Sequence, residues 1–172
     1  ADILIQKIQS QKSIRIIGDY DIDGVTSTYI LYTGLKKCGA VVDYEIPDRI
    51  RDGYGINRQL VLDAWEAGVD TILTCDNGIS AIEQIAYAKE LGMTVIVTDH
   101  HELRTTEKNG KTQVILPDAD VVINPHQPDC LYPYKDLCGG AVAYKLVQEL
   151  YQKNGFPDNE IEHLIEYAAI AT

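Results

Sequence analysis

Hydrophobic and polar positions follow one another along the chain as in a sheet whose strands are separated by helices. Short apolar, β-branched runs predict strands at residues 14–18, 41–46, 70–75, 93–98 and 121–123. Apolar positions three or four residues apart predict helices over 1–12, 24–38, 57–67, 79–91 and 139–153, and a last one from near Pro157. This order predicts an α/β fold, a five-stranded, mostly parallel sheet with helices on both faces.

Some details of the pattern are less regular. The helix over 24–38 is expected to bury an inner stripe of Val25, Tyr29, Leu31, Tyr32 and Leu35. Residues 47–56 are rich in Pro, Gly, Asp and Arg and predict a loop. Residues 103–118 are polar, contain a Lys-Asn-Gly-Lys turn, and predict a surface excursion.

Composition limits the class of protein. The 172 residues are enough for one domain, 45% of them are hydrophobic, and no apolar stretch approaches the roughly 18 residues that cross a membrane. The first residues carry an acid and no basic region, unlike a signal peptide. The cysteines are far apart and form no CxxC pair, which indicates reduced thiols and a cytoplasmic protein without a membrane partner.

Acidic residues and histidines follow the predicted strands. Asp19, Asp21 and Asp23 follow the first strand, Asp76 the third and Asp99 the fourth; His100 and His101 come next, and Asn124 follows the last strand. Ligands of parallel sheets bind outside the carboxyl ends of the strands, so four loops are expected to converge on one edge.

These acids need a positive charge. Close carboxylates repel one another, and no lysine or arginine lies within these motifs. A divalent cation or a pair of them answers this need, with Mn²⁺ favoured by mixed Asp and His ligands and Mg²⁺ by oxygen ligands alone. Single acids such as Asp23 or Asp76 can instead cap helices, but three such sites on one edge favour metal.

The two histidines are expected to have different roles. Successive side chains of an extended segment diverge, so one can ligate metal while the other donates a hydrogen bond to a phosphoryl oxygen or acts as an acid. Two metals about 3.5–4 Å apart would activate a water for attack on a phosphate. The net charge of −11, from 15 basic and 26 acidic residues, argues against a large phosphate-binding surface in this chain.

Six motifs in this order resemble the DHH phosphoesterase superfamily and, within it, RecJ-type single-stranded-DNA-specific exonucleases. They are GDYDIDGVTS at 18–27, RIRDGYG at 49–55, CDNGIS at 75–80, VTDHHE at 97–102, INPHQ at 123–127 and LCGGAVAYKL at 137–146. The resemblance covers nearly the whole chain. It implies a five-stranded parallel core and two Mn²⁺ or Mg²⁺ ions.

The resemblance also implies roles for individual residues. Asp21 and Asp23 each belong to one metal, Asp76 bridges both, and His100 ligates the second. His101 contacts the phosphate, and Asp99 supports the histidines from behind. The implied reaction is hydrolysis of phosphodiesters by a metal-activated water, removing nucleotides from the 5′ end of single-stranded DNA in recombination and repair. Single-stranded nucleic acid, and replication or repair proteins, are the implied partners.

The chain departs from the family pattern at two points. Where several relatives have a metal-binding histidine, this chain has Ile17, and Asp19 is expected to compensate. A further metal aspartate follows, in the family, a segment like YAAIAT at 167–172, so it is expected beyond Thr172 together with a second domain that closes over the substrate. Residues 1–172 are therefore expected to be a truncated DHH catalytic domain that folds, binds its second metal weakly and has little nuclease activity.

Weaker signals give further substrate-binding candidates. Arg49, Arg51 and Arg58 flank Tyr54, which can stack on a base. Gly139 and Gly140 open a helix and can offer amides to a phosphate or allow tight packing. Asn124 can hydrogen-bond a ligand or a supporting group. His126 and His163 are interpreted as surface or structural residues.

Three alternatives remain from the sequence. A haloacid-dehalogenase-type phosphatase would use Asp21 as a covalent nucleophile and Asp23 as an acid, but would leave the Asp-His-His triplet unexplained. A DHH phosphodiesterase would act on short oligonucleotides or cyclic dinucleotides. A RecJ-like scaffold would bind a partner without catalysis.

Overall fold

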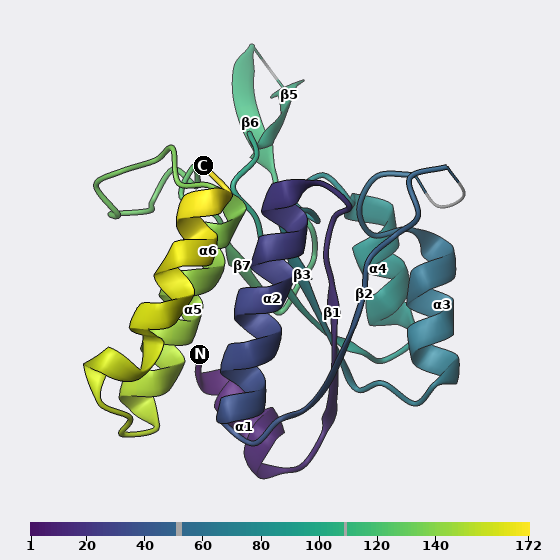
Figure 1. Ribbon diagram of the computed structural model, residues 1–172. Helices are drawn as coiled ribbons and strands as arrows, with labels where there is room; N and C mark the ends of the chain where they lie inside the picture. The colour runs from purple at the N-terminus through teal and green to yellow at the C-terminus, as the bar shows by residue number, and fades with distance from the viewer. Residues whose placement is uncertain (51–52, 109) are drawn as a thin grey trace.

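A five-stranded parallel sheet forms the centre of the fold (Figure 1). The computed structural model describes residues 1–50, 53–108 and 110–172. The strands are ordered β2-β1-β3-β4-β7, and each neighbouring pair is parallel. Their bounds are β1 Ser13–Ile17, β2 Val41–Glu45, β3 Thr71–Cys75, β4 Thr94–Thr98 and β7 Val121–Ile123. The predicted α/β class and sheet are confirmed.

Helices cover both faces of this sheet (Figure 1). On one face, α1 (Asp2–Gln9), α2 (Ile22–Lys37), α5 (Gly139–Lys153) and α6 (Ile165–Ile170) share a core with Ile14, Leu73 and Ile96. On the other, α3 (Arg58–Glu66) and α4 (Ile82–Glu90) share a core with Ile72 and Val95. Because successive strand residues point to opposite faces, apolar runs such as β3, buried throughout, supply both cores.

The strand register brings the predicted site loops to one edge. Ile17 lies opposite Thr74, Cys75 opposite Thr98, and Thr98 opposite Ile123. The loops that follow β1, β3, β4 and β7 therefore leave the sheet at the same level. This is the edge at which parallel sheets bind ligands.

The polar excursion after β4 is an antiparallel hairpin. β5 (Arg104–Lys108) pairs with β6 (Lys111–Ile115), and the hairpin projects from the top of the molecule in Figure 1. The prediction of a surface excursion is confirmed, whereas its strands were not predicted. All five residues of β5 are exposed, so the segment lacks the buried face that produces a strand pattern.

Two expected details were wrong. Val25 and Tyr29 of α2 are 41% and 42% exposed, because α2 turns Ile30 inward, along with the predicted Leu31 and Leu35 and with small polar residues near its start. α4 begins at Ile82 rather than residue 79, after a turn in which Gly78 has a φ of 108°. The last helix begins at Asp158, as predicted, with a 3₁₀ segment, η1 (Asp158–Leu164), before α6.

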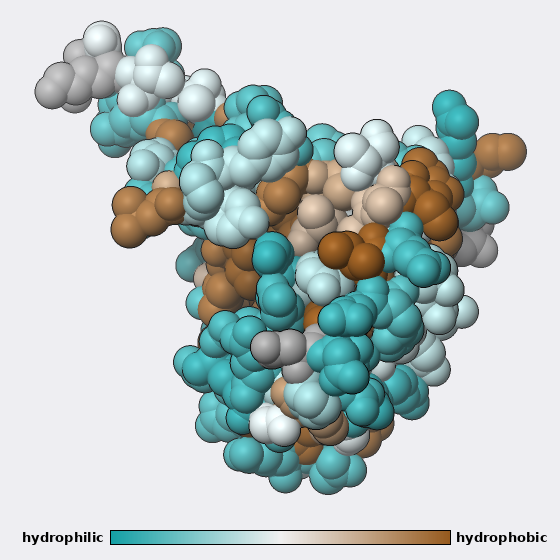
Figure 2. Space-filling view, turned by 60° about the vertical axis from the view of Figure 1, so that its left-hand side comes forward, coloured by the Kyte–Doolittle hydropathy of each residue, from teal (hydrophilic) through white to brown (hydrophobic). Residues whose placement is uncertain are grey.

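The surface is unevenly hydrophobic. In Figure 2, hydrophobic side chains gather in the upper half of the face turned forward, below the projecting hairpin, and the lower half is mostly hydrophilic. The large apolar side chains that are exposed on α2, α6 and the 125–137 loop are Ile22, Val25, Tyr29, Ile165, Ile170, Leu131, Tyr132 and Tyr134. Within the described part of the chain, no helix is long and apolar enough to span a bilayer.

Candidate metal centre

Asp76 turns the chain sharply at the end of β3. Its φ is 58°, a left-handed conformation that Asp tolerates better than most residues, and only 2% of it is exposed. Asn77 fixes this turn, because its side-chain amide donates to the carbonyls of Ile17, at 3.0 Å, and Cys75, at 2.8 Å. The ends of β1 and β3 are thereby joined beneath the Asp76 carboxylate.

The three acids after β1 have different environments. Asp21 is exposed and caps α2, its Oδ1 accepting from the amide of Gly24 at 2.9 Å. Asp19 is fully buried; its Oδ1 accepts from the amide of Gly55 at 3.4 Å, and its Oδ2 has no hydrogen-bond donor. A buried, unpaired carboxylate oxygen is costly, which makes it a natural ligand for a cation.

Asp23 is held by the amino end of α5. Its Oδ2 accepts from the amide of Gly139 at 2.7 Å and its Oδ1 from the amide of Gly140 at 2.6 Å. These two donors hold the Asp23 carboxylate at the amino end of the helix, where the helix dipole favours an acidic side chain. From the sequence, these two amides were expected to bind a substrate phosphate or to allow tight packing. In this structure they donate hydrogen bonds to Asp23 instead.

The Asp-His-His triplet after β4 separates its two rings. Asp99, 1% exposed, accepts from His101 Nδ1 at 2.7 Å through Oδ1 and from the amide of Ile79 at 2.9 Å through Oδ2. His100 points the other way, with Nε2 3.0 Å from Asp76 Oδ1 and 3.4 Å from Asp23 Oδ2. Asp99 therefore lies behind His101, and His100 lies among the acids.

Two overlapping groups of ligand atoms result. Asp19, Asp21 and Asp76 form one, and Asp76, His100 and His101 form the other; within each, the ligand atoms lie within 4.8 Å of one another. Asp76 belongs to both. Its Oδ1 lies close to His100 Nε2 but has no hydrogen bond of proper geometry, so a second buried oxygen lacks a donor. Both donor sets suit Mn²⁺, and the first suits Mg²⁺ as well.

The electrostatics reflect a cluster that lacks a positive charge. Burial, with the nearby Asp23 and Asp21 carboxylates, raises the pKa of Asp76 to about 6 despite its contact with His100. Burial also raises the pKa of Asp19. The Asp76 carboxylate, 3.0 Å from the His100 ring, raises the pKa of His100. Protons therefore offset the repulsion among these acids at low pH, and a cation can replace them.

Most of the chain matches one protein family. A profile described as "DHH family, N-terminal domain" matches residues 13–172. The chain belongs to the DHH family. Its Asp99-His100-His101 triplet is the family's namesake sequence, and membership removes the reason to interpret Asp21 as a haloacid-dehalogenase nucleophile.

DHH proteins of known activity and structure resemble the chain along its whole length. The single-stranded-DNA-specific exonuclease RecJ of Bacillus subtilis is 44% identical over 172 residues, which is 100% of this chain and 20% of the relative. A crystal structure of exonuclease RecJ bound to manganese has 35% identity and a TM-score of 0.80 over 99% of this chain and 40% of that one.

A second solved structure agrees with the first. RecJ from Thermus thermophilus in complex with Mn²⁺ has 33% identity and a TM-score of 0.73, covering 99% of this chain and 22% of that one. The chain spans only part of these relatives, about a fifth of the length of the Bacillus exonuclease.

Tyr54 enters the DHH site in a way the sequence did not predict. Its hydroxyl donates to the carbonyl of Asp76 at 3.2 Å and lies 3.2 Å from His101 Nε2. The loop that carries it is fixed by Asn77, whose Oδ1 accepts from the amide of Ile56 at 3.1 Å. Tyr54 was predicted as a substrate-binding candidate, whereas Asn77 was not predicted; its place inside the CDNGIS motif was the only signal.

The other sequence candidates lie around this centre or away from it. The guanidinium of Arg49 is 5.4 Å from the Tyr20 ring centre, and that of Arg58 stacks on Tyr87 of α4, at 3.7 Å. Arg51 lies outside the described residues. The Asn124 amide donates to the carbonyl of His101 at 2.9 Å, so Asn124 supports the triplet's loop.

Two histidines lie outside the triplet, and among the described residues neither belongs to a group of ligand atoms. His126 is half-buried, with its Nδ1 3.8 Å from Glu102 Oε1, and His163 is exposed. Their interpretation as surface or structural residues stays a prediction.

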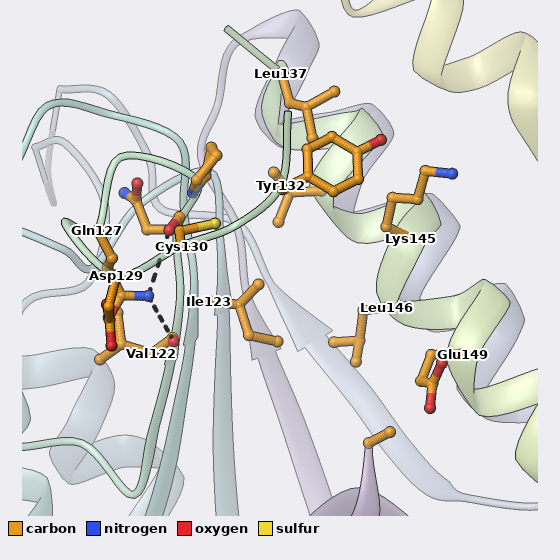
Figure 3. A pocket seen from close by; sticks show the side chains of 14 residues that line it. Val122, Ile123, Gln127, Asp129, Cys130, Tyr132, Leu137, Lys145, Leu146 and Glu149 are labelled. Carbon is orange, nitrogen blue, oxygen red and sulfur yellow. Dashed lines mark hydrogen bonds between the residues drawn. The ribbon is translucent and has the colours of Figure 1, made fainter. Parts of the chain in front are cut away.

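Two cavities lie near the DHH centre. One of about 430 Å³ borders His101 and Tyr54 and continues along residues 77–81. A larger one, about 590 Å³, lies between β7 and α5, where Ile123 and Leu146 face each other (Figure 3). Its walls include Leu137 and Val142, and Asn124 links it to the triplet. Among the described residues, no member of the two groups of ligand atoms lines this larger cavity.

Proposed function

We propose that the chain is the metal-binding catalytic part of an exonuclease that hydrolyses phosphodiester bonds of single-stranded DNA with Mn²⁺ or Mg²⁺, in recombination and repair. The observation that carries this proposal is Asp76, which belongs to two groups of ligand atoms and has a buried oxygen without a donor. A carboxylate shared by two cations is typical of two-metal phosphoesterase sites. The exonuclease activity of the RecJ relatives supports the same reaction.

The proposed ligand sets start from the two groups. Asp19, Asp21 and Asp76 would hold the first cation. Asp76 and His100 would hold the second, with Asp23 beside them, whereas His101 of the second group would be left for the phosphate. When bound, the pair of cations lowers the pKa of a water and offsets the charge of the phosphate. The amides of α5 fix the position of Asp23 for this purpose.

His101 has the proposed role of a hydrogen-bond donor to the phosphate. The hydrogen bond to Asp99 raises the pKa of His101 to about 9, so the ring is protonated at neutral pH. Its Nδ1 contacts the buried Asp99, and Nε2, which faces the Tyr54 hydroxyl, is the nitrogen proposed for a phosphoryl oxygen. Asp99 thus orients the ring and keeps it charged, as the supporting carboxylate does in other acid–base sites.

Domain organisation, location and partners belong to the same proposal. We propose that residues 1–172 are a DHH catalytic domain; they correspond to 20% of the length of the Bacillus subtilis relative. A cytoplasmic location is supported by the four free cysteines of the described residues, which suit a reducing compartment. Replication or repair proteins are the partners that this activity would require.

Calorimetric titration with Mn²⁺ tests the proposal. The chain is expected to bind one ion tightly and a second weakly, and Asp76→Asn, which keeps the shape of the side chain but removes its charge, is expected to weaken both at least tenfold. Asp63→Asn, at an exposed acid of α3, is the matched control and should bind as the unaltered chain does. Equal Mn²⁺ binding by the chain and its Asp76→Asn variant would refute the proposal.

A hydrolysis assay then identifies the substrate. A 5′-labelled single strand with Mn²⁺ should be degraded slowly by the 172-residue chain, and not at all by Asp76→Asn. Preference for dinucleotides over longer strands would favour the short-oligonucleotide phosphodiesterase, and Mn²⁺ binding without hydrolysis of either substrate would favour the scaffold.

A further inference from the structure

The His101 ring has a hydrogen-bond partner at each nitrogen. Nδ1 lies 2.7 Å from Asp99 Oδ1, and Nε2 lies 3.2 Å from the hydroxyl of Tyr54. The ring is therefore held from behind by a buried carboxylate and from the front by a tyrosine. The front nitrogen is the one that the proposed function assigns to the phosphate.

Counting protons gives the direction of these bonds. The Tyr54 hydroxyl has one proton, which it donates to the carbonyl of Asp76. Towards His101 the same oxygen can then only accept, so His101 donates from Nε2 to Tyr54 as well as from Nδ1 to Asp99. A phosphoryl oxygen of the substrate would also accept a hydrogen bond from His101 Nε2. The Tyr54 oxygen and that phosphoryl oxygen would therefore occupy the same position.

The loop around Tyr54 is built to bring the hydroxyl to this place. Gly55 has a φ of 62°, and a Cβ at this position would lie 2.9 Å from the Cβ of Asn77. The amide of Gly55 donates to Asp19, and that of Ile56 donates to Asn77. The Tyr54 side chain itself is 54% exposed, so the ring borders solvent and a ligand can displace its hydroxyl.

We propose that Tyr54 is a positioning residue whose hydroxyl, in the absence of substrate, occupies the place of a phosphoryl oxygen at His101 Nε2. This inference rests on the proposed function. The hydroxyl keeps the imidazole aligned before substrate arrives, and the substrate must displace it. Tyr54 therefore lowers the affinity for phosphate esters, which is the opposite of what a tyrosine that contacted the substrate would do.

The test measures binding of thymidine 5′-monophosphate to the chain in saturating Mn²⁺. Tyr54→Phe removes the competing oxygen, so its affinity for the nucleotide should rise about two- to tenfold, the range expected for one net hydrogen bond. Tyr54→Leu should change the affinity in the same direction. Tyr134→Phe, at an exposed tyrosine of the 125–137 loop, is the control and should leave the affinity unchanged.

A double-mutant cycle with His101→Ala distinguishes the mechanism. Because Tyr54 acts through His101, Tyr54→Phe should have no effect on nucleotide affinity in the His101→Ala background. Weaker binding by Tyr54→Phe in both backgrounds would show a direct contact with the phosphate and overturn the inference, as would an unchanged affinity. Mn²⁺ binding by each variant is titrated separately, so failure of the chain itself to bind Mn²⁺ refutes the proposed function, whereas failure of the Tyr54 variants to differ refutes only the inference.

Discussion

Asp76 combines an uncommon backbone conformation with a buried carboxylate. Its left-handed φ of 58° is held by the hydrogen bonds of Asn77, and its side chain lies where two groups of ligand atoms meet. Strain of this kind persists only where the surroundings enforce it, and it is concentrated at functional sites. The position therefore depends on neighbours as much as on the aspartate itself.

The protonation of Asp76 should control metal affinity. Its pKa is raised to about 6, so below that pH the carboxyl holds a proton that a cation must displace, and above it the anion is free. Mn²⁺ affinity should therefore rise with pH, by up to about tenfold per unit for each displaced proton below the pKa, and level off above it. Because the pKa of His100 is also raised, its proton steepens the same trend.

Titration calorimetry across this pH range measures both the affinity and the protons released. Buffers with different ionisation enthalpies report the number of protons directly. An affinity that is the same on both sides of the Asp76 pKa would show that Asp76 does not ligate the ion.

At the scale of elements, α2 and α5 approach each other closely at Gly34. A Cβ at this position would lie 2.4 Å from Val147 Cγ1 and 2.6 Å from Val147 Cγ2. Val147 is branched at its own Cβ and fully buried, so it has little room to move. The glycine therefore lets these two helices pack face to face on one side of the sheet.

Gly34→Ala should destabilise the fold in spite of alanine's better helix propensity. Overpacking costs about 1–3 kcal/mol, against a gain of about 1 kcal/mol from replacing glycine in a helix. Urea unfolding followed by circular dichroism should show a lower midpoint. Adding Val147→Ala should recover part of the loss, so the double variant should lose less than the sum of the two single changes. A higher midpoint for Gly34→Ala alone would contradict this packing.

The elements that the sequence predicted well are those with a buried face. Strands β3 and β4 are buried almost throughout because helices cover both faces, and β1 is buried at Ile14, Ile16 and Ile17, so each shows a clear apolar run. β5 is exposed throughout, so neither alternation nor an apolar run marks it. The stripe of α2 was misjudged at Val25 and Tyr29 because its inward face near the site is made of small polar residues, which carry no hydropathy signal.

At the scale of the whole molecule, the β5–β6 hairpin projects from the carboxyl edge of the central sheet. Replacing residues 105–114 with a short Gly-Ser turn should leave the melting temperature and the Mn²⁺ affinity nearly unchanged, because β5 is exposed and pairs with β6 rather than with the central sheet. Shortening a loop changes its closure entropy by only about 0.6 kcal/mol for each halving. A large loss of Mn²⁺ affinity would show that the hairpin supports the site.

The candidate site could be predicted only in part. The acids after each strand could be placed at one edge because parallel topology fixes where strand ends meet. The contacts of Tyr54 and Asn77 could not be predicted, because their partners lie far away in sequence: Tyr54 reaches His101 across 47 residues, and Asn77 reaches Ile17 across 60. Likewise, nothing local indicated that the amides of Gly139 and Gly140 would bond Asp23, 116 and 117 residues earlier.

The buried oxygens of Asp19 and Asp76 that lack donors have a consequence for folding itself. Without a cation, the native chain holds these groups away from water uncompensated, whereas the unfolded chain leaves them hydrated. An ion that binds only the native form contributes about 2.7 kcal/mol of stability at a hundred times its dissociation constant. The fraction of folded protein would then depend on the concentration of divalent ions. When the metal is scarce, more of the chain would be unfolded and degraded, so the amount of protein would fall.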